Sequence, residues 1–67
     1  MSIFQQIYDC EINFEISCFW DGGFTIKLGD KSNGYKAIAV VDTWGEVEDW
    51  FILMMKKEYK IEIKDNN

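Results

Sequence analysis

The sequence predicts a small α+β domain in which a three-stranded antiparallel β-meander packs against one α-helix. Three stretches, residues 10–20, 24–28 and 35–41, alternate between apolar and polar side chains, which is the period of a strand with one buried face. Turn sequences separate these stretches, and a helix-capping sequence follows the last of them. The chain has 67 residues, so residues 1–67 are expected to form a single domain near the lower size limit for independent folding.

The chain opens with a helical pattern and continues into the first strand. Apolar residues at helical spacing predict a short helix within residues 1–8. From Cys10 the period becomes two, and the apolar series that runs to Trp20 predicts a half-buried strand with Cys18 in the core. Along such a strand Cys10 and Cys18 would be about 26 Å apart, at about 3.3 Å per residue, so no disulfide between them is expected.

Two more strands follow the first. Residues 21–23, Asp-Gly-Gly, predict a tight hairpin turn, because glycine accepts the positive φ that such turns require. Residues 24–28 then alternate as the second strand, and the polar segment 29–34 ends in the turn sequence Asn-Gly. The third strand, residues 35–41, becomes apolar on both faces near its end, which is typical of a central or well-covered strand.

The helix is predicted to run from Trp44 to residues 57–59. Thr43 and Glu46 have the spacing of a capping box, in which each residue satisfies a backbone amide of the other. Acidic residues follow in the first turns of the helix, and lysines occupy its last turns. This distribution of charge is the one that the helix dipole favours.

The end of the chain leaves two alternatives open. Residues 59–64 alternate again between apolar and charged side chains. They either add a short fourth strand, whose lysines would protect a sheet edge from aggregation, or extend the helix. Residues 64–67 are expected to fray, as chain ends commonly do.

The composition argues against catalysis. The chain contains no histidine, so neither a Ser-His nor a Cys-His arrangement can be built. Its two cysteines lack the CxxC spacing of zinc and redox sites, and its acids match no calcium-binding loop. Those acids also fall on predicted solvent faces, whereas a catalytic carboxyl needs an apolar pocket to raise its pKa. The protein is therefore expected not to be an enzyme and to bind neither a cofactor nor a metal.

The charge indicates which partners suit the chain. Twelve acids and seven lysines give a net charge of −5, and arginine is absent. Because phosphate backbones are held by cationic side chains, direct nucleic-acid binding is not expected. A partner protein with a basic surface fits this charge better. The chain lacks a signal pattern and an apolar run of membrane length, which predicts a cytoplasmic protein that does not enter a membrane.

In its compact size, acidity, hairpin-plus-helix pattern and lack of catalytic groups, the chain resembles the small phage-encoded inhibitors called anti-CRISPR proteins. The resemblance is one of profile over the whole chain, and no motif aligns. In that class, acidic residues often occupy target surfaces that normally receive DNA. The resemblance implies an inhibitor that works in the host cytoplasm and docks on a basic, nucleic-acid-binding surface. The acids that become candidate contacts are Glu11, Glu15, Asp42, Glu46, Glu48 and Asp49.

Two apolar residues of the predicted helix suggest a different partner. Ile52 and Leu53 project from sides of the helix where a surface helix should be polar. Either the tail or the opening segment covers them, or they form a docking or dimer surface. The second alternative would make the chain a structural or oligomerising module, such as a homodimer. Salt would weaken binding through acids, whereas it would not weaken association through this apolar surface.

Overall fold

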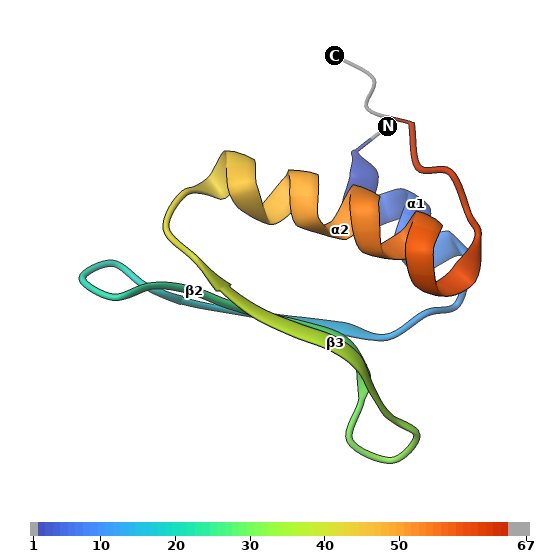
Figure 1. Cartoon of the computed structure of the whole chain (residues 1–67), viewed down its shortest axis with the longest axis horizontal. Coiled ribbons are helices and arrows are strands. Elements are labelled where there is room, and N and C mark those ends of the chain that lie inside the picture. Colours follow the sequence, from blue (N-terminus) through green and yellow to red (C-terminus); the bar gives the residue numbers. More distant parts are fainter. Residues whose placement is uncertain (1, 65–67) are drawn as a thin grey trace.

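The structure is a computed structural model that describes residues 2–64. Five elements follow one another along the chain (Figure 1). They are α1 (Ile3–Asp9), β1 (Phe14–Phe19), β2 (Gly23–Asp30), β3 (Gly34–Val41) and α2 (Trp44–Tyr59). The three strands form one antiparallel sheet in the order β1-β2-β3. The predicted α+β meander is therefore confirmed, and α1 supplies a second helix to its helical layer.

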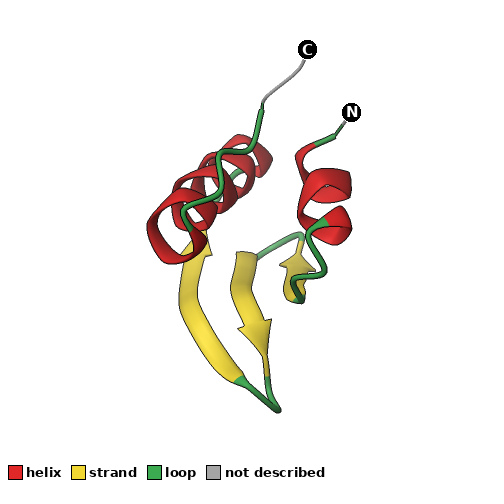
Figure 2. Cartoon of the chain, turned by 90° about the vertical axis from the view of Figure 1, so that its right-hand side faces the viewer, coloured by secondary structure: helices red, strands yellow, loops and turns green. Residues whose placement is uncertain are grey.

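Both helices cover the same face of the sheet, so the molecule has two layers (Figure 2). α2 packs on β2 and β3, and α1 packs beside α2. Because side chains alternate along a strand, every second residue of β2 faces the helices. Fully burying one large apolar side chain stabilises the fold by about 1.5–3 kcal/mol. The buried apolar side chains are Ile3, Ile7, Ile26, Leu28, Val47, Phe51, Met55 and Ile63.

An aromatic cluster holds the short helix α1 in place. The ring of Phe4 lies 5.7 Å from that of Phe14 and 5.6 Å from that of Phe51, measured between centroids. The rings of Phe14 and Phe51 are 5.5 Å apart. Such pairs contribute about 0.5–1.5 kcal/mol each beyond the burial of their area. Since a helix of seven residues is not stable alone, α1 depends on this contact with β1 and α2.

Helix α2 begins and ends where side-chain chemistry requires. Its capping box is formed, because the Glu46 amide donates to Thr43 Oγ1 at 3.2 Å and the Thr43 amide donates to Glu46 Oε1 at 3.0 Å. At the other end Lys60 adopts a left-handed φ of 59°, and its amide bonds back to the Lys56 carbonyl. This conformation stops the helix. The predicted range of α2 is confirmed at both ends.

Both alternatives for residues 59–64 are wrong beyond Tyr59. Residues 60–64 neither extend the helix nor form a strand, since the turn at Lys60 sends the chain back over α1. There the Gln6 side chain pairs with the backbone of Lys64, donating to its carbonyl at 2.6 Å and accepting from its amide at 2.9 Å. Ile63 is buried, which explains the alternating pattern. Lys64 is therefore held rather than frayed, and residues 65–67 lie outside the described part.

The first strand is shorter than predicted. Helix α1 continues to Asp9, and the Cys10 amide donates to the Gln6 carbonyl at 3.2 Å. Glu11 then turns the chain with a φ of 60°, so β1 begins only at Phe14. The prediction that Cys18 lies in the core is wrong, because Cys18 is exposed. β1 is an edge strand, and its hairpin with β2 extends beyond α2 (Figure 1). The two cysteines are free, as expected.

The interpretation of the third strand as central or well covered is also wrong. β3 lies at an edge of the sheet, and only its helix-facing residues pack on the core, Ala39 and Val41 among them. On the outer face the side chains of Ile38 and Val40 are 58% and 68% exposed. The apolar pattern on both faces therefore marks an uncovered surface. Within residues 2–64 no helix combines the length and apolarity needed to cross a bilayer.

Candidate protein-binding surface

The predicted contact residues do not form one surface. The strands run between two ends of the sheet, and the β1–β2 hairpin turn lies at the same end as the start of α2 (Figure 1). Asp42, Glu46, Glu48 and Asp49 belong to that end. Glu11 lies at the opposite end, in the turn between α1 and β1, and Glu15 lies mid-strand on the outer face of the sheet.

The hairpin turn and the start of α2 form one continuous surface, which we call the acidic end and define as residues 19–23 and 42–49. A Cβ on Gly23 would lie 2.7 Å from the Val41 carbonyl oxygen and 3.5 Å from Asp42 Oδ1. The ring of Trp44 packs 5.1 Å from that of Phe24. Glycine is needed at position 23, because its φ is +85° and the adjacent strand leaves no room for a side chain.

The charge of the acidic end has a single sign. It carries five acids and no lysine. Glu48 is half-buried on the helix, whereas Asp21, Asp42 and Asp49 are exposed. The lysines of the chain lie in the middle of β2, around the β2–β3 turn, and in residues 56–64. A surface of one sign raises the local concentration of oppositely charged groups and speeds their association.

Glu46 belongs to the acidic end but has a structural role. Its Oε1 accepts hydrogen bonds from the amides of Asp42 and Thr43, at 3.2 and 3.0 Å, and from the Thr43 hydroxyl at 3.1 Å. The sequence carries no signal for the Asp42 bond, which joins the end of β3 to α2. The exposed carboxylates of this end that make no such bond within residues 2–64 are those of Asp21, Asp42 and Asp49.

Exposed aromatic side chains belong to the same acidic end. Trp20 is 94% exposed in the hairpin turn, and Phe19 and Trp44 are exposed as well. The turn itself is ordered by a 2.9 Å bond from the Gly22 amide to the Phe19 carbonyl. Sequence reasoning missed Trp20 by assigning it to the buried face of the first strand. The signal that could have found it is its position directly before the Asp-Gly-Gly turn, where no element covers a side chain.

Glu15 makes local contacts on the outer face of the sheet. The Tyr35 hydroxyl donates a hydrogen bond to Glu15 Oε2, and Lys27 Nζ lies 5.1 Å from the centre of the Tyr35 ring. The bond to Glu15 is the main reason that the pKa of Tyr35 is raised above its ordinary value of 10.0. The charge of Glu15 is thus shared within a small cluster and lies apart from the acidic end.

The two apolar helix residues are in different environments. Ile52 is half-buried and packs against the core. Leu53 is exposed. Together they make no continuous apolar helix surface, because only one of the two faces solvent. The larger apolar exposure lies at the hairpin tip and on the outer face of β3.

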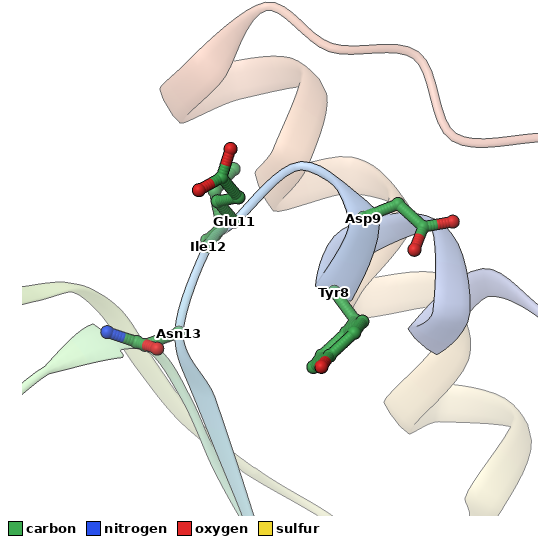
Figure 3. Close-up of a pocket in the computed structure, with 5 residues that line it drawn as sticks. All are labelled: Tyr8, Asp9, Glu11, Ile12 and Asn13. Carbon is green, nitrogen blue, oxygen red and sulfur yellow. The ribbon is translucent and has the colours of Figure 1, made fainter.

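A shallow hollow lies between α1 and the start of β1 (Figure 3). Its lining comes from five consecutive or nearly consecutive residues: Tyr8, Asp9, Glu11, Ile12 and Asn13. In Figure 3 the carboxylates of Asp9 and Glu11 point away from each other, so they do not converge on a common ligand. Residues 2–64 contain no group of three or more side chains that could hold a metal ion.

No protein-family model matches the chain, and no curated protein or solved structure is similar enough to count as a match. The acidic end must therefore be interpreted from its own chemistry.

Proposed function

We propose that the protein is a binding module that docks its acidic end on a basic surface of a partner protein. One observation carries the proposal. Trp20 is 94% exposed on a surface that carries five acids and no lysine. Tryptophan is among the residues that most often dominate binding energy in interfaces, and an exposed one beside uniform charge is a ready anchor.

The chemistry of this surface fits lysine and arginine side chains. Exposed indole rings attract cations over their faces, which contributes about 0.5–1 kcal/mol at an exposed site and more once water is removed. The carboxylates of Asp21, Asp42 and Asp49 would add charge-assisted bonds to the same cations. They would also speed the encounter with a basic partner, an effect that salt reduces.

A module of this kind would inhibit its partner by occupying the partner's basic surface. A basic surface on a protein commonly receives nucleic acid, because phosphates require cationic contacts. A module that covers such a surface excludes the nucleic acid from it. The resemblance to anti-CRISPR proteins supports this role, as does the net charge of −5.

The alternative, an oligomerising module that uses Ile52 and Leu53, has less support. Ile52 is half-buried in the monomer, which leaves a single exposed leucine as its anchor.

The test compares two variants with equal changes in charge. In the first, Asp21→Asn, Asp42→Asn and Asp49→Asn remove charge from the acidic end. In the matched control, Glu11→Gln, Glu58→Gln and Glu62→Gln remove the same charge elsewhere. The wild-type chain first captures a partner from host extract, and the affinity of that purified partner is then measured for all three proteins at low and high salt.

The proposal expects a large loss of affinity for the acidic-end variant and little change for the control. It also expects the wild-type affinity to fall as salt rises. Equal losses in both variants would assign the effect to net charge alone, and unchanged binding by the acidic-end variant would contradict the proposal.

A further inference from the structure

Among residues 2–64, no strand pairs with the outer edge of β3, so backbone groups are left unpaired there. In an antiparallel ladder the amide and carbonyl of successive residues point to opposite sides of the strand. The Gly29 amide donates to the Asn13 carbonyl at 2.8 Å, so Gly29 directs its backbone groups to β1. Leu28 and Ile26, the first and third residues before it, therefore direct theirs to β3.

The register of β2 and β3 then fixes which residues of β3 face outward. Leu28 is opposite Ala37, and Ile26 is opposite Ala39. These alanines bond to β2, so Ile38 and Val40 present their amides and carbonyls at the free edge. A bulge at Lys36 interrupts the ladder, but the pairing from Ala37 to Val41 is regular. The edge is thus a short template for another strand.

We propose that this edge pairs with β3 of a second copy of the chain, antiparallel about a two-fold axis at Ala39. In this register Ile38 lies opposite Val40 of the second copy, and Lys36 lies opposite Asp42. The two sheets then join into one sheet of six strands. The interface is isologous, so every contact occurs twice.

Charge selects this register from its neighbours. Residues whose backbone groups point to the free edge must lie opposite residues of the second copy whose groups do the same. The register can therefore shift only in steps that keep both Ile38 and Val40 opposite such residues. Moving the axis to Ile38 places Lys36 opposite Val40 and Asp42 opposite Gly34. Moving it to Val40 places Asp42 opposite Ile38. Only the axis at Ala39 gives Lys36 and Asp42, both exposed in the monomer, an opposite charge across the strand.

The other edge of the sheet lacks this complementarity. β1 has a single charged side chain, Glu15, so self-pairing of β1 brings no opposite charges together. It is also shorter than β3, with six residues against eight. The free edge of β3 is therefore the better template for a second copy.

The helical layer takes part in the proposed dimer. α2 packs on both β2 and β3, and a two-fold axis between antiparallel β3 strands is perpendicular to the sheet. The two α2 helices would therefore lie on the same side of the joined sheet, next to each other across the axis. On the outer face the exposed Ile38 and Val40 of both copies would form one apolar cluster.

Two charge exchanges test the register. Lys36→Asp brings two acids together at each end of the paired strands, and Asp42→Lys brings two lysines together. For each variant alone, the Kd of the dimer should be at least about tenfold higher than that of the wild type. The reason is that a pair of opposite charges becomes a pair of like charges at both ends of the paired strands. Mixed in equal amounts, the two variants should form a heterodimer, since each then meets its opposite. Native mass spectrometry distinguishes this species from both homodimers.

A monomeric wild-type chain throughout the millimolar range would overturn the proposal. So would variants that dimerise as readily as the wild type, because the register would then be wrong. Circular dichroism confirms that each variant is folded before its mass is interpreted. As an independent measurement, the amides of Ile38 and Val40 should exchange with deuterium more slowly as protein concentration rises. Fast exchange at every concentration would also overturn the dimer.

Discussion

Thr43 and Glu46 satisfy each other's amides at the start of α2, and the Glu46 carboxylate also accepts the Asp42 amide. One pair of side chains thus fixes the helix start and ties it to the end of β3. Gly23 and Lys60 have the same kind of influence, because their positive φ values set the hairpin and the helix end. The capping pair and the Asp-Gly-Gly turn were predictable, since local chemistry alone determines them. The left-handed Lys60 was not, because lysine carries no signal for that conformation.

Replacing Thr43 tests the cap. Thr43→Ala removes the acceptor of the Glu46 amide and should lower the free energy of unfolding by about 0.5–2 kcal/mol. In a domain of this size about 1 kcal/mol lowers Tm by about 4–8 °C. Glu46→Gln is the matched control, because glutamine can still accept the Thr43 amide, and it should change Tm less. An unchanged Tm for Thr43→Ala would show that the cap does not stabilise α2.

Asp30 makes the free energy of unfolding depend on pH in the acidic range. Its carboxylate accepts bonds from Asn13 Nδ2 at 2.6 Å and from the Asn33 amide at 2.7 Å, and these bonds lower its pKa below 3.8. A carboxyl whose pKa is lower in the folded state than in the unfolded state stabilises the fold at pH values above its unfolded pKa. This stabilisation is lost as the pH falls through its folded pKa. Asp30→Asn should therefore lower Tm at pH 7, and the difference from wild type should shrink below pH 3.8. Thermal melts across this range measure it, and a constant difference would contradict the account.

Elements at the two ends of the chain stabilise each other. Gln6 of α1 bonds to both backbone groups of Lys64, and Ile63 is buried in the core. No sequence pattern could predict this contact, because the alternation of residues 59–64 suits a strand equally well. The residue at which β1 begins could not be predicted from the sequence for a similar reason. Residues 10–13 continue the alternation of the strand, although Cys10 and Glu11 complete the end of α1.

Releasing Gln6 tests the contact between α1 and the end of the chain. Gln6→Ala removes the two hydrogen bonds to the Lys64 backbone and a longer one, of 3.5 Å, to the Ser2 carbonyl within α1. A typical hydrogen bond contributes about 0.5–1.5 kcal/mol net. The substitution should lower Tm and speed deuterium exchange at the Lys64 amide. Gln5→Ala is the control, because in the described part of the chain the Gln5 side chain bonds to Asp9 of its own helix and not to Lys64. If Gln5→Ala and Gln6→Ala had equal effects on Lys64 exchange, the tail would not be held by Gln6.

The whole molecule separates a packed core from a charged, aromatic end. Composition and period were enough to predict the meander, α2 and the excess of acid, because these depend on local pattern and total charge. Which acids gather was not predictable. Glu11 and Glu15 were grouped by an assumed strand, whereas the fold places the hairpin tip beside the start of α2. Trp20 was assigned to the core, since a period of two cannot show that the helical layer ends before the strand does.

A single side chain offers the sharpest test of the docking surface. Trp20 is 94% exposed, so Trp20→Ala should leave Tm nearly unchanged. If Trp20 anchors the partner, its truncation should cost at least about 2 kcal/mol of binding, which raises Kd about thirtyfold. Tyr8→Ala is the matched control, because Tyr8 is also an exposed aromatic residue, at 72%, but belongs to α1.

The measurement is the Kd of the captured basic partner for the wild-type chain, Trp20→Ala and Tyr8→Ala, by titration calorimetry at low salt. Docking through the acidic end predicts that Trp20→Ala binds the partner more weakly than the wild type and that Tyr8→Ala binds it equally well. If a folded Trp20→Ala bound the partner as tightly as the wild type, docking through Trp20 would be contradicted.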